Sequence, residues 1–357
     1  MDRGGYDIPN QSPNTPLHLK RVGVKRHSIP IRVVDPFGSG STVPLSCSVG
    51  AFLSLAPERR GIHVSRIGDL LAQLSEQAYP SLQDYAVKAN ALLRSGQDGH
   101  SARVEVEGVL TYLESVSGVK KKKSLEHLEI FAECDFHNGR TSVSNGVGFS
   151  HITACPCVQE TYRNSFAGHQ PSPSKARPGK GMPLLTHTQR CQTRIRIANV
   201  SEPVALSELL SCIDGVVVRS QNTLPREFEL LNVYRAHARP QFLEDALRDL
   251  LVGVYRLLRR PSAEGALLIK TTSMESIHDF DMEGEIEFSV KELDRIFAAC
   301  KGAAALVVPR LGVTAKTLNG SGSTGNGVAG RIQKAGRKKP GKPLPIKRSP
   351  QAHSSRS

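Results

Sequence analysis

The spacing of apolar residues along the chain predicts alternating strands and helices. Apolar and polar residues alternate in eight stretches, which we interpret as β-strands: residues 28–34, 43–55, 102–116, 125–133, 145–155, 192–200, 265–272 and 284–290. Apolar residues recur every three or four positions in four stretches, which we interpret as helices: residues 67–74, 82–93, 203–210 and 240–258. The pattern therefore predicts an α+β fold.

The predicted elements repeat the order strand-strand-helix-helix-strand-strand. The first set spans residues 28–144, and the second, with one additional strand before it, spans residues 145–308. An extended lead-in, residues 1–27, precedes both sets. A segment rich in Pro, Gly and Ser, residues 163–185, is interpreted as an exposed loop inserted in the second set. Residues 309–357 lack apolar periodicity and are expected to form a disordered basic tail.

The composition is that of a globular protein of the cytoplasm. Of the 357 residues, 39% are hydrophobic, which is enough for a packed core. There is no run of about 18 apolar residues, and the first residues lack the apolar centre of a secretion signal. Most of the net charge of +14 belongs to the tail, because eleven Lys and Arg residues and no Asp or Glu lie from Arg310 onward. We therefore expect a nearly neutral body that makes no contact with membranes.

Two cysteines around one proline are the most informative feature of the chain. Cys155 and Cys157 follow a β-prone run, so a strand is expected to end where two sulfur atoms are presented. Seven cysteines scattered along a chain without a secretion signal indicate reduced thiols, which permits thiolate coordination of a metal. Taken alone, the Cys-x-Cys pair is a weak signal and is better explained as two buried thiols at a strand end.

Other side chains of metal-ligand type accompany this pair. His187 precedes a predicted strand, and Glu229 lies in an acidic stretch. Glu275 and His278 stand three positions apart after another predicted strand. Zn, Fe(II) and Mn(II) all accept a mixture of thiolate, imidazole and carboxylate, and three protein ligands with an open position are typical of a catalytic site. Each residue alone also suits an ordinary loop or surface role, so only the combination indicates a site.

Five motifs occur in the order in which the type IB GTP cyclohydrolases carry them. They are Gly61-Ile-His-Val-Ser-Arg66, Thr153-Ala-Cys-Pro-Cys157, His187-Thr-Gln-Arg190, Arg239-Pro-Gln-Phe-Leu-Glu-Asp245 and Glu275-Ser-Ile-His278. Over about residues 17–295 the chain thus resembles this family, which includes an archaeal branch. The resemblance implies the tunnelling fold (T-fold), with two strand-strand-helix-helix-strand-strand modules per chain. It also implies assembly into a barrel-like homo-oligomer, usually a tetramer, with sites at the subunit interfaces.

The resemblance further implies an activity, that of a hydrolase acting on cyclic amidines. Enzymes of the family convert GTP and water to 7,8-dihydroneopterin 3′-triphosphate and formate, the first step of folate and pterin biosynthesis. Cys155, His187 and Glu229 match the metal-binding positions of the family. Water made acidic by a divalent metal is a suitable nucleophile for C8 of guanine. The expected catalytic residues are Cys155, Cys157, Glu275 and His278.

Four further residues are expected to bind the substrate. Glu244, as a buried carboxylate, would accept hydrogen bonds from the ring N–H and the exocyclic amine of guanine. Arg66 and Arg190 would bind the triphosphate together with His63, because a guanidinium group presents a fork of donors to phosphate. Donation of these cationic groups across a subunit boundary is an open alternative.

Departures from the family pattern leave other functions open. Glu229 follows Arg226-Glu-Phe where the family usually has Arg-Pro-Asp, and Asp279 stands where a second histidine is common. The long insertion after Cys157 is similar to the archaeal branch, whose product is the 2′,3′-cyclic phosphate of 7,8-dihydroneopterin. The basic tail suggests weak polyanion contact, or a nucleic-acid-binding protein on an enzyme-derived fold. A tunnelling-fold protein without activity is a further alternative.

Overall fold

The computed structural model describes residues 7–97, 101–115, 122–166, 185–200, 202–258 and 264–299, all of them within one compact unit, Met1–Ala315. The predicted tail and most of the predicted inserted loop lie outside the described residues. The strands are β1 (Leu19–Val34), β2 (Thr42–Leu55), β3 (Ala78–Tyr79), β4 (Ala102–Ser115), β5 (Lys123–His137), β6 (Arg140–Ala154), β7 (Thr188–Ala198), β8 (Val218–Arg219), β9 (Ala266–Met274) and β10 (Asp281–Ser289). The helices are η1 (Ile8–Asn10), α1 (Val64–Ser75), α2 (Leu82–Gln97), α3 (Pro156–Phe166), α4 (Leu206–Val216), α5 (Arg226–Ala238), α6 (Leu243–Leu257) and α7 (Val290–Ala299).

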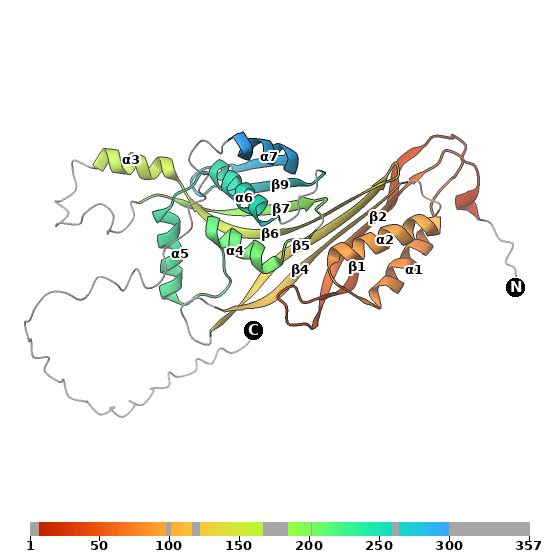
Figure 1. Ribbon diagram of the computed structural model, residues 1–357, viewed down its shortest axis with the longest axis horizontal. Coiled ribbons are helices and arrows are strands. Elements are labelled where there is room, and N and C mark those ends of the chain that lie inside the picture. The colour runs from red at the N-terminus through yellow and green to blue at the C-terminus, as the bar shows by residue number, and fades with distance from the viewer. Residues whose placement is uncertain are drawn as a thin grey trace, which may run out of the picture. The chain divides into compact units, whose positions relative to one another are not determined.

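The strands form one continuous sheet in which most neighbours are antiparallel (Figure 1). Its order is β10-β9-β7-β6-β5-β4-β2-β1-β3, and β8 pairs separately with β6. Only β1 and β3 pair in parallel among the described strands, which makes the sheet mixed. The turn between β5 and β6 is formed by Asn138 and Gly139, whose φ angles of 50° and 76° suit a tight hairpin. This hairpin joins the two halves of the chain within the same sheet.

The predicted tunnelling fold of two strand-strand-helix-helix-strand-strand modules is wrong. The predicted boundary between residues 144 and 145 falls inside β6, which pairs with β5 from Glu129↔Gly148 to His137↔Arg140. The second half also departs from the predicted order, because α3 separates β6 from β7 and three helices, α4, α5 and α6, separate β7 from β9. The tight turn at residues 138–139 joins β5 directly to β6, so the chain forms one ten-stranded sheet instead of two modules.

Most individual elements agree with the apolar spacing. The main exceptions are β1, which begins at Leu19 within the predicted lead-in, and the helices α3, α5 and α7, which were not predicted. Helix α5 has little apolar periodicity, since both Leu230 and Val233 are exposed on it. Within the described residues no helix is both long enough and apolar enough to cross a membrane.

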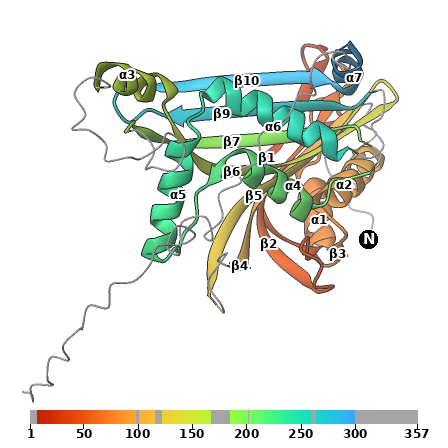
Figure 2. The same cartoon turned by 60° about the vertical axis from the view of Figure 1, so that its left-hand side comes forward.

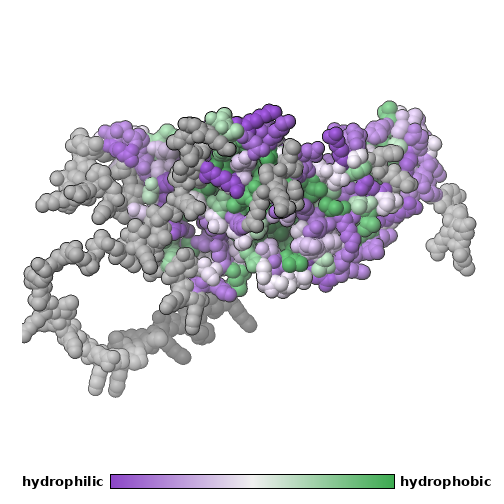
Figure 3. Space-filling view, viewed as in Figure 1, coloured by the Kyte–Doolittle hydropathy of each residue, from purple (hydrophilic) through white to green (hydrophobic). Residues whose placement is uncertain are grey.

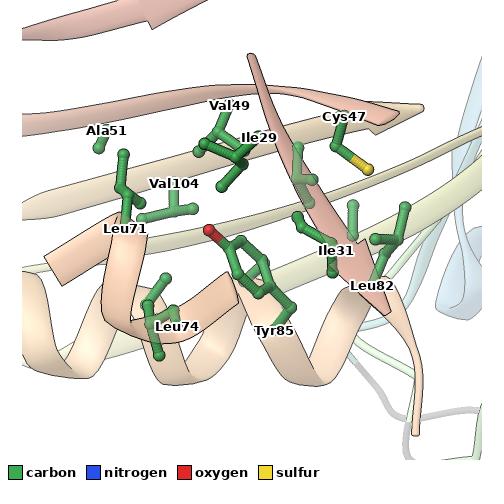
Figure 4. Close-up of a cluster of buried hydrophobic side chains, with 14 of the residues drawn as sticks. Ile29, Ile31, Cys47, Val49, Ala51, Leu71, Leu74, Leu82, Tyr85 and Val104 are labelled. Atoms are coloured by element: carbon green, nitrogen blue, oxygen red, sulfur yellow. The ribbon is translucent and has the colours of Figure 1, made fainter. Parts of the chain in front are cut away.

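One face of the sheet is covered by helices, as Figure 2 shows for α1, α2, α4 and α6. In the first half, alternate residues of β1, β2 and β4 point toward α1 and α2, and Figure 4 shows Ile31, Val49 and Val104 facing Leu71 and Tyr85. These side chains are almost fully buried. The outer surface around α1 and α2 is largely hydrophilic (Figure 3), so both helices are amphipathic. Burial of aliphatic side chains on this face is the main stabilising contribution.

In the second half, α4 and α6 pack over β7, β9 and β10. The side chains of Leu247 and Leu250 on α6 join Ile195 and Ile269 of the sheet in a second buried cluster. At Gly284 on β10, the terminal methyl groups of Leu243 and Leu247 occupy the place of a Cβ atom, so a larger residue there would make these two side chains shift. The start of α6 thus packs directly on the backbone of β10.

The opposite face of the sheet carries ion pairs. Arg103 lies 2.9 Å from Glu133, and Arg196 lies 3.2 Å from the same carboxylate. Arg194 pairs with Glu129 at 2.8 Å, with Glu107 at 3.1 Å, and lies over the ring of Phe131. This face is therefore polar, whereas the helix-bearing face holds the two apolar clusters.

Candidate active site

The Cys-Pro-Cys motif lies where β6 ends and α3 begins. Ala154 is the last residue of β6, and Pro156 is the first of α3, a position that suits proline because its missing N–H has no partner in a helix. Cys155 is half-buried between them, while Cys157 is exposed on α3. The main-chain carbonyl of Cys155 accepts a hydrogen bond from the amide of Gln159 at 3.4 Å. The backbone at Cys155 is thus held from within α3.

His187 lies beside Cys155 at the start of β7. The pairing of β6 and β7 runs up to Ala154↔Thr188, and one step further the amide of Cys155 donates to the carbonyl of His187 at 3.1 Å. The hydroxyl of Thr186 donates to the carbonyl of Cys155 at 2.7 Å. The Nδ1 atom of His187 lies 3.2 Å from the hydroxyl oxygen of Ser276. His187 is therefore connected both to the Cys155 backbone and to the Glu275-Ser-Ile-His278 motif.

Glu275 and His278 occupy the connection between β9 and β10. Glu275, half-buried, accepts a hydrogen bond from the hydroxyl of Ser273 at 2.8 Å. His278 is exposed, and its ring stacks on that of Phe280 with the centroids 4.9 Å apart and an angle of 8° between the planes. Because Ser276 contacts His187, this connection lies at the same end of the sheet as Cys155. Figure 2 shows α3 and α5 at that end, close to the start of β10.

Two of the four predicted substrate-binding residues belong to this end of the sheet. Arg190 lies on β7 between Ile152 and Met274, and its side chain is exposed. Glu244 lies in the first turn of α6 and is exposed, whereas a buried carboxylate was expected. The main-chain amide of Gln241, just before α6, bonds to the carbonyl of Ala154 at 3.1 Å, which places the start of α6 near the Cys155 turn.

His63 and Arg66 belong to the first half of the chain. Arg66 is exposed on α1. His63 immediately precedes α1, and its Nε2 atom lies 3.4 Å from a carboxylate oxygen of Asp7. Helix α1 packs on β1 and α2, while the Cys155 turn lies on β6, across the sheet from these elements. A single chain therefore does not bring His63 and Arg66 to Cys155.

The three predicted metal ligands do not gather in a single chain. Glu229 is exposed on α5, two turns before His237, which corresponds to about 12 Å along the helix axis. It is the end of α5 at His237 that contacts the Cys155 region. Among the described residues there is no group of three His, Cys, Asp or Glu side chains that could hold a metal ion. The donor chemistry of Cys155 and His187 suits a divalent metal, but the three-residue set does not fit one within this chain.

Sequence reasoning missed two residues that connect the Cys155 turn with α5: His237 on α5 and Gln159 on α3. The Nε2 atom of His237 lies 3.1 Å from the carbonyl oxygen of Thr186, and its Nδ1 atom lies 2.9 Å from that of Val233. The side-chain amide of Gln159 donates to the carbonyl of His237 at 2.8 Å. Helix α3, the start of β7 and the end of α5 are thus bonded to one another. No spacing pattern indicated this role, because α5 itself was not predicted.

A third missed group lies within the Arg239-Pro-Gln-Phe-Leu-Glu-Asp245 motif and the helix after it. Asp249 accepts hydrogen bonds from Arg239 at 2.8 Å and from the side chain of Gln241 at 3.2 Å. Burial raises the pKa of the Asp249 carboxyl, while Arg239 and both hydrogen bonds act in the opposite direction. Since Gln241 also bonds to Ala154, the motif supports the Cys155 turn from behind. The motif itself was recognised in the sequence, which was the available signal.

Comparisons with known proteins identify the family. The model of the family described as "Type I GTP cyclohydrolase folE2" matches residues 6–283. A protein called GTP cyclohydrolase MptA from Thermoplasma acidophilum is 28% identical over 302 residues, covering 81% of this chain and 97% of the relative. GTP cyclohydrolase MptA from Methanococcoides burtonii is 26% identical and covers 76% of this chain and 90% of the relative.

Solved structures give a weaker likeness. Uricase from Arthrobacter globiformis aligns with a TM-score of 0.45 and 7% identity, covering 76% of this chain and 94% of the uricase.

The match to the family model covers all five motifs and the ends of β6, β7 and β9 where Cys155, His187 and Glu275 lie. The chain belongs to the type I GTP cyclohydrolase (folE2) family.

Proposed function

We propose that this protein is a GTP cyclohydrolase that converts GTP and water to 7,8-dihydroneopterin 3′-triphosphate and formate, the first step of folate and pterin biosynthesis. The observation that carries the proposal is the meeting of Cys155, His187 and Glu275 at one end of the sheet, through the bond from Cys155 to His187 and the contact of His187 with Ser276. The family match supports the same conclusion.

The reaction requires several proton transfers in one place. Water adds to C8 of guanine, the imidazole ring opens, formate leaves, and the ribose rearranges before the new ring closes. General acids and bases near the substrate accelerate such steps. Glu275 and His278, on the connection after β9, are the proposed proton carriers, and Cys157, exposed at the start of α3, is a third. Their different exposure suits groups that must exchange protons with the substrate and with water.

The proposed recognition of GTP uses charged side chains around this end of the sheet. Glu244, in the first turn of α6, would accept the two N–H donors of guanine, which adenine cannot supply in the same arrangement. Arg190 on β7 would bind the triphosphate. His63 and Arg66 lie on the other half of the chain, so we propose that a neighbouring subunit of a homo-oligomer, such as a tetramer, supplies them.

A shared site predicts recovery of activity in mixed oligomers. Cys155→Ala and Arg66→Ala each remove one half of the proposed site. When the two inactive variants are unfolded together and refolded, some sites receive an intact Cys155 from one subunit and an intact Arg66 from another. Activity well above that of either variant alone would support the shared site. Continued inactivity of a mixture shown to contain mixed oligomers would argue that each chain works alone.

A divalent metal, Zn, Fe(II) or Mn(II), remains part of the proposal. Cys155 and His187 have the right donor chemistry, and a bound metal would supply a more acidic water. Glu229 is exposed on α5, and among the described residues no third donor joins Cys155 and His187. In this proposal Cys155 and His187 would be two ligands of the metal, and a further donor would complete its coordination.

The deciding experiment is anaerobic reconstitution with each metal, followed by assay of GTP for formate and for a fluorescent pterin. The wild type should turn over GTP, and Cys155→Ala should lose at least about a hundredfold in kcat, as expected when a catalytic group is removed. Cys212→Ala is the matched control, because Cys212 is a half-buried thiol on α4 away from the motifs. Wild-type protein that binds metal but releases no formate from GTP would refute the proposal.

A second product deserves a direct comparison. The relatives described above carry the name MptA, and the archaeal branch makes the 2′,3′-cyclic phosphate of 7,8-dihydroneopterin. The ring chemistry is shared, so only the fate of the triphosphate differs. Mass analysis of the pterin formed from GTP separates the two products. A linear triphosphate supports the first proposal, and a cyclic monophosphate with released pyrophosphate supports the second.

A further inference from the structure

A row of buried polar side chains runs across three neighbouring strands, on one face of the sheet, and ends at Glu275. Thr153 on β6, Cys191 on β7 and Ser273 on β9 all face the helix-bearing side and are at most 4% exposed. Two rows deeper, the same face holds Ile195 and Ile269, a cross-strand pair that is fully buried. Apolar residues thus fit this face, and polar ones replace them close to the candidate active site. The replacement needs a reason, because buried polar groups are costly unless they are hydrogen-bonded.

The three side chains are bonded to one another in sequence. The hydroxyl oxygen of Thr153 lies 3.5 Å from the sulfur of Cys191. Cys191 is paired across the strands with Ser273 and hydrogen-bonded to its side chain. The hydroxyl of Ser273 donates to the carboxylate of Glu275 at 2.8 Å. A continuous chain of hydrogen bonds therefore connects β6, two residues before Cys155, with Glu275 after β9.

The direction of these hydrogen bonds follows from the number of protons. A carboxylate only accepts, so the single hydroxyl hydrogen of Ser273 is directed to Glu275. Ser273 then accepts from the S–H of Cys191, and Cys191 accepts from the hydroxyl of Thr153. Burial raises the pKa of Cys191, so its sulfur keeps the hydrogen that it donates. Each donor in the chain has one acceptor, and the last acceptor is the Glu275 carboxylate.

We propose that Cys191 and Ser273 are positioning residues that hold the Glu275 carboxylate for proton transfer, an inference that rests on the proposed cyclohydrolase activity. Ser273 is the hydrogen-bond donor to Glu275, and Cys191, supported by Thr153, fixes the rotamer of Ser273. The connection after Glu275 is exposed, so a carboxylate without this donor would sample several rotamers. Displacement of a catalytic group by about 1 Å can reduce a rate about a hundredfold.

Thr271 offers a matched control for this inference. It lies two residues before Ser273 on the same strand, is 1% exposed, and its hydroxyl lies 2.8 Å from that of Thr193. Thr193 in turn contacts His151, not Glu275. Thr271→Val therefore removes a buried hydroxyl from the same strand and the same face without touching the chain of Thr153, Cys191 and Ser273. A purely structural role of buried hydroxyls would affect both strand positions alike.

The test measures kcat and KM for GTP, together with the thermal midpoint, in four single variants and one double variant of the full chain. Ser273→Ala should lower kcat by about 10-fold to 100-fold and leave KM within about twofold, because only the carboxylate geometry changes. Cys191→Ala should lower kcat in the same way. Cys191→Ser should restore kcat to within about threefold of the wild type, since a hydroxyl also accepts and donates one hydrogen bond. Thr271→Val should leave kcat within about twofold.

Specific results of these measurements would overturn the positioning role of Cys191 and Ser273. Equal losses of kcat in Ser273→Ala and Thr271→Val, or a Cys191→Ser variant no faster than Cys191→Ala, would overturn the positioning role while leaving the cyclohydrolase activity intact. The double variant Cys191→Ala with Ser273→Ala should be no slower than Ser273→Ala alone, because both act through one carboxylate. Fully multiplicative losses would also overturn the inference. A wild type that does not turn over GTP would instead refute the proposed function, and the inference with it.

Discussion

The main-chain amide of Cys155 donates to the carbonyl oxygen of His187 across 3.1 Å, at the point where β6 and β7 cease to be paired. A hydroxyl completes this junction, because Thr186 donates to the carbonyl of Cys155 at 2.7 Å. The segments before and after the predicted inserted loop are thus hydrogen-bonded to each other at Cys155, Thr186 and His187. This junction fixes the positions of Cys155 and His187 relative to each other.

Thr186→Val is expected to weaken the junction. The substitution keeps the shape of a side chain that is 8% exposed, but it removes the shorter of the two hydrogen bonds to the carbonyl of Cys155 and leaves only the one from the amide of Gln159 at 3.4 Å. One hydrogen bond contributes a net of about 0.5–1.5 kcal/mol, so the free energy of unfolding in urea should fall by about that amount. Thr188→Val, two residues further along β7, serves as the control. Equal loss of stability in both variants would show that the hydroxyl of Thr186 has no special role.

The strand ends of the candidate site were predictable, whereas their support was not. The run before Cys155 alternates and ends at a proline motif, so β6 and its terminal cysteine follow from local sequence. The register that places His187 beside Cys155 spans the insertion, and the sequence of either strand alone does not determine it. The roles of His237 and Gln159 depend on α5, whose apolar residues Leu230 and Val233 are exposed and give no helical pattern.

The error in the fold has a local cause. The turn at Asn138 and Gly139, a strong hairpin signal, lies in residues 134–144, between the predicted strands 125–133 and 145–155. This turn joins β5 and β6 in one long hairpin, and the hairpin joins the two halves of the chain in one sheet. Local periodicity predicts single strands well, but the continuity of a sheet depends on its turns.

Arg219 anchors the far end of β4 and should be among the most sensitive positions for stability. Its guanidinium group is 6% exposed, lies 2.8 Å from both Asp214 and Glu114, and donates to the hydroxyl of Tyr112 at 2.8 Å. Burial by itself lowers the pKa of Arg219, but Asp214 and Glu114 outweigh burial, and the pKa is raised above its usual value. Arg219→Met would leave two carboxylates without their cation; because Asp214 is 45% and Glu114 26% exposed, water can still reach them, and the free energy of unfolding should fall by about 1–3 kcal/mol.

The control for Arg219→Met is Arg163→Met. Arg163 pairs with Glu160 on α3, and both side chains are more than half exposed, so this pair should contribute under about 1 kcal/mol. Urea unfolding of both variants measures the contrast. Similar destabilisation by the two substitutions would contradict the assignment of Arg219 as a buried ionic anchor.

Glu129, on the polar face of the sheet, should make stability fall as pH rises. Burial is the largest cause that raises its pKa, the hydrogen bond with Glu107 adds to it, and the pKa reaches about 7 despite the nearby Arg194. Because the folded protein holds this proton more tightly than the unfolded chain, the stabilisation is complete below pH 4.5 and is lost as pH rises through 7.

Glu129→Gln removes this titration and can still donate a hydrogen bond to Glu107. The difference in urea midpoint between the variant and the wild type should therefore grow in favour of the variant from pH 5 to pH 8. Glu285→Gln, an exposed position on β10, is the control and should show no such trend. A constant difference between Glu129→Gln and the wild type over this range would contradict the raised pKa.

His151 should act on stability with the opposite sign. Its ring is fully buried beside Thr193, with Nε2 2.8 Å from the hydroxyl oxygen, and burial lowers its pKa from 6.5 to about 4. The unfolded chain then binds the proton more readily, so the stabilisation is present above pH 6.5 and is lost as pH falls toward 4.

His151→Gln keeps a polar group near Thr193 and cannot titrate. Its urea midpoint should therefore rise relative to the wild type between pH 7.5 and pH 5, whereas that of Glu129→Gln should fall over the same interval. Since the two effects overlap between about pH 4.5 and 6.5, the wild type should show a flatter pH dependence there than either variant. If the urea midpoints of the two variants, each relative to the wild type, changed in the same direction between pH 7.5 and pH 5, this compensation would be disproved.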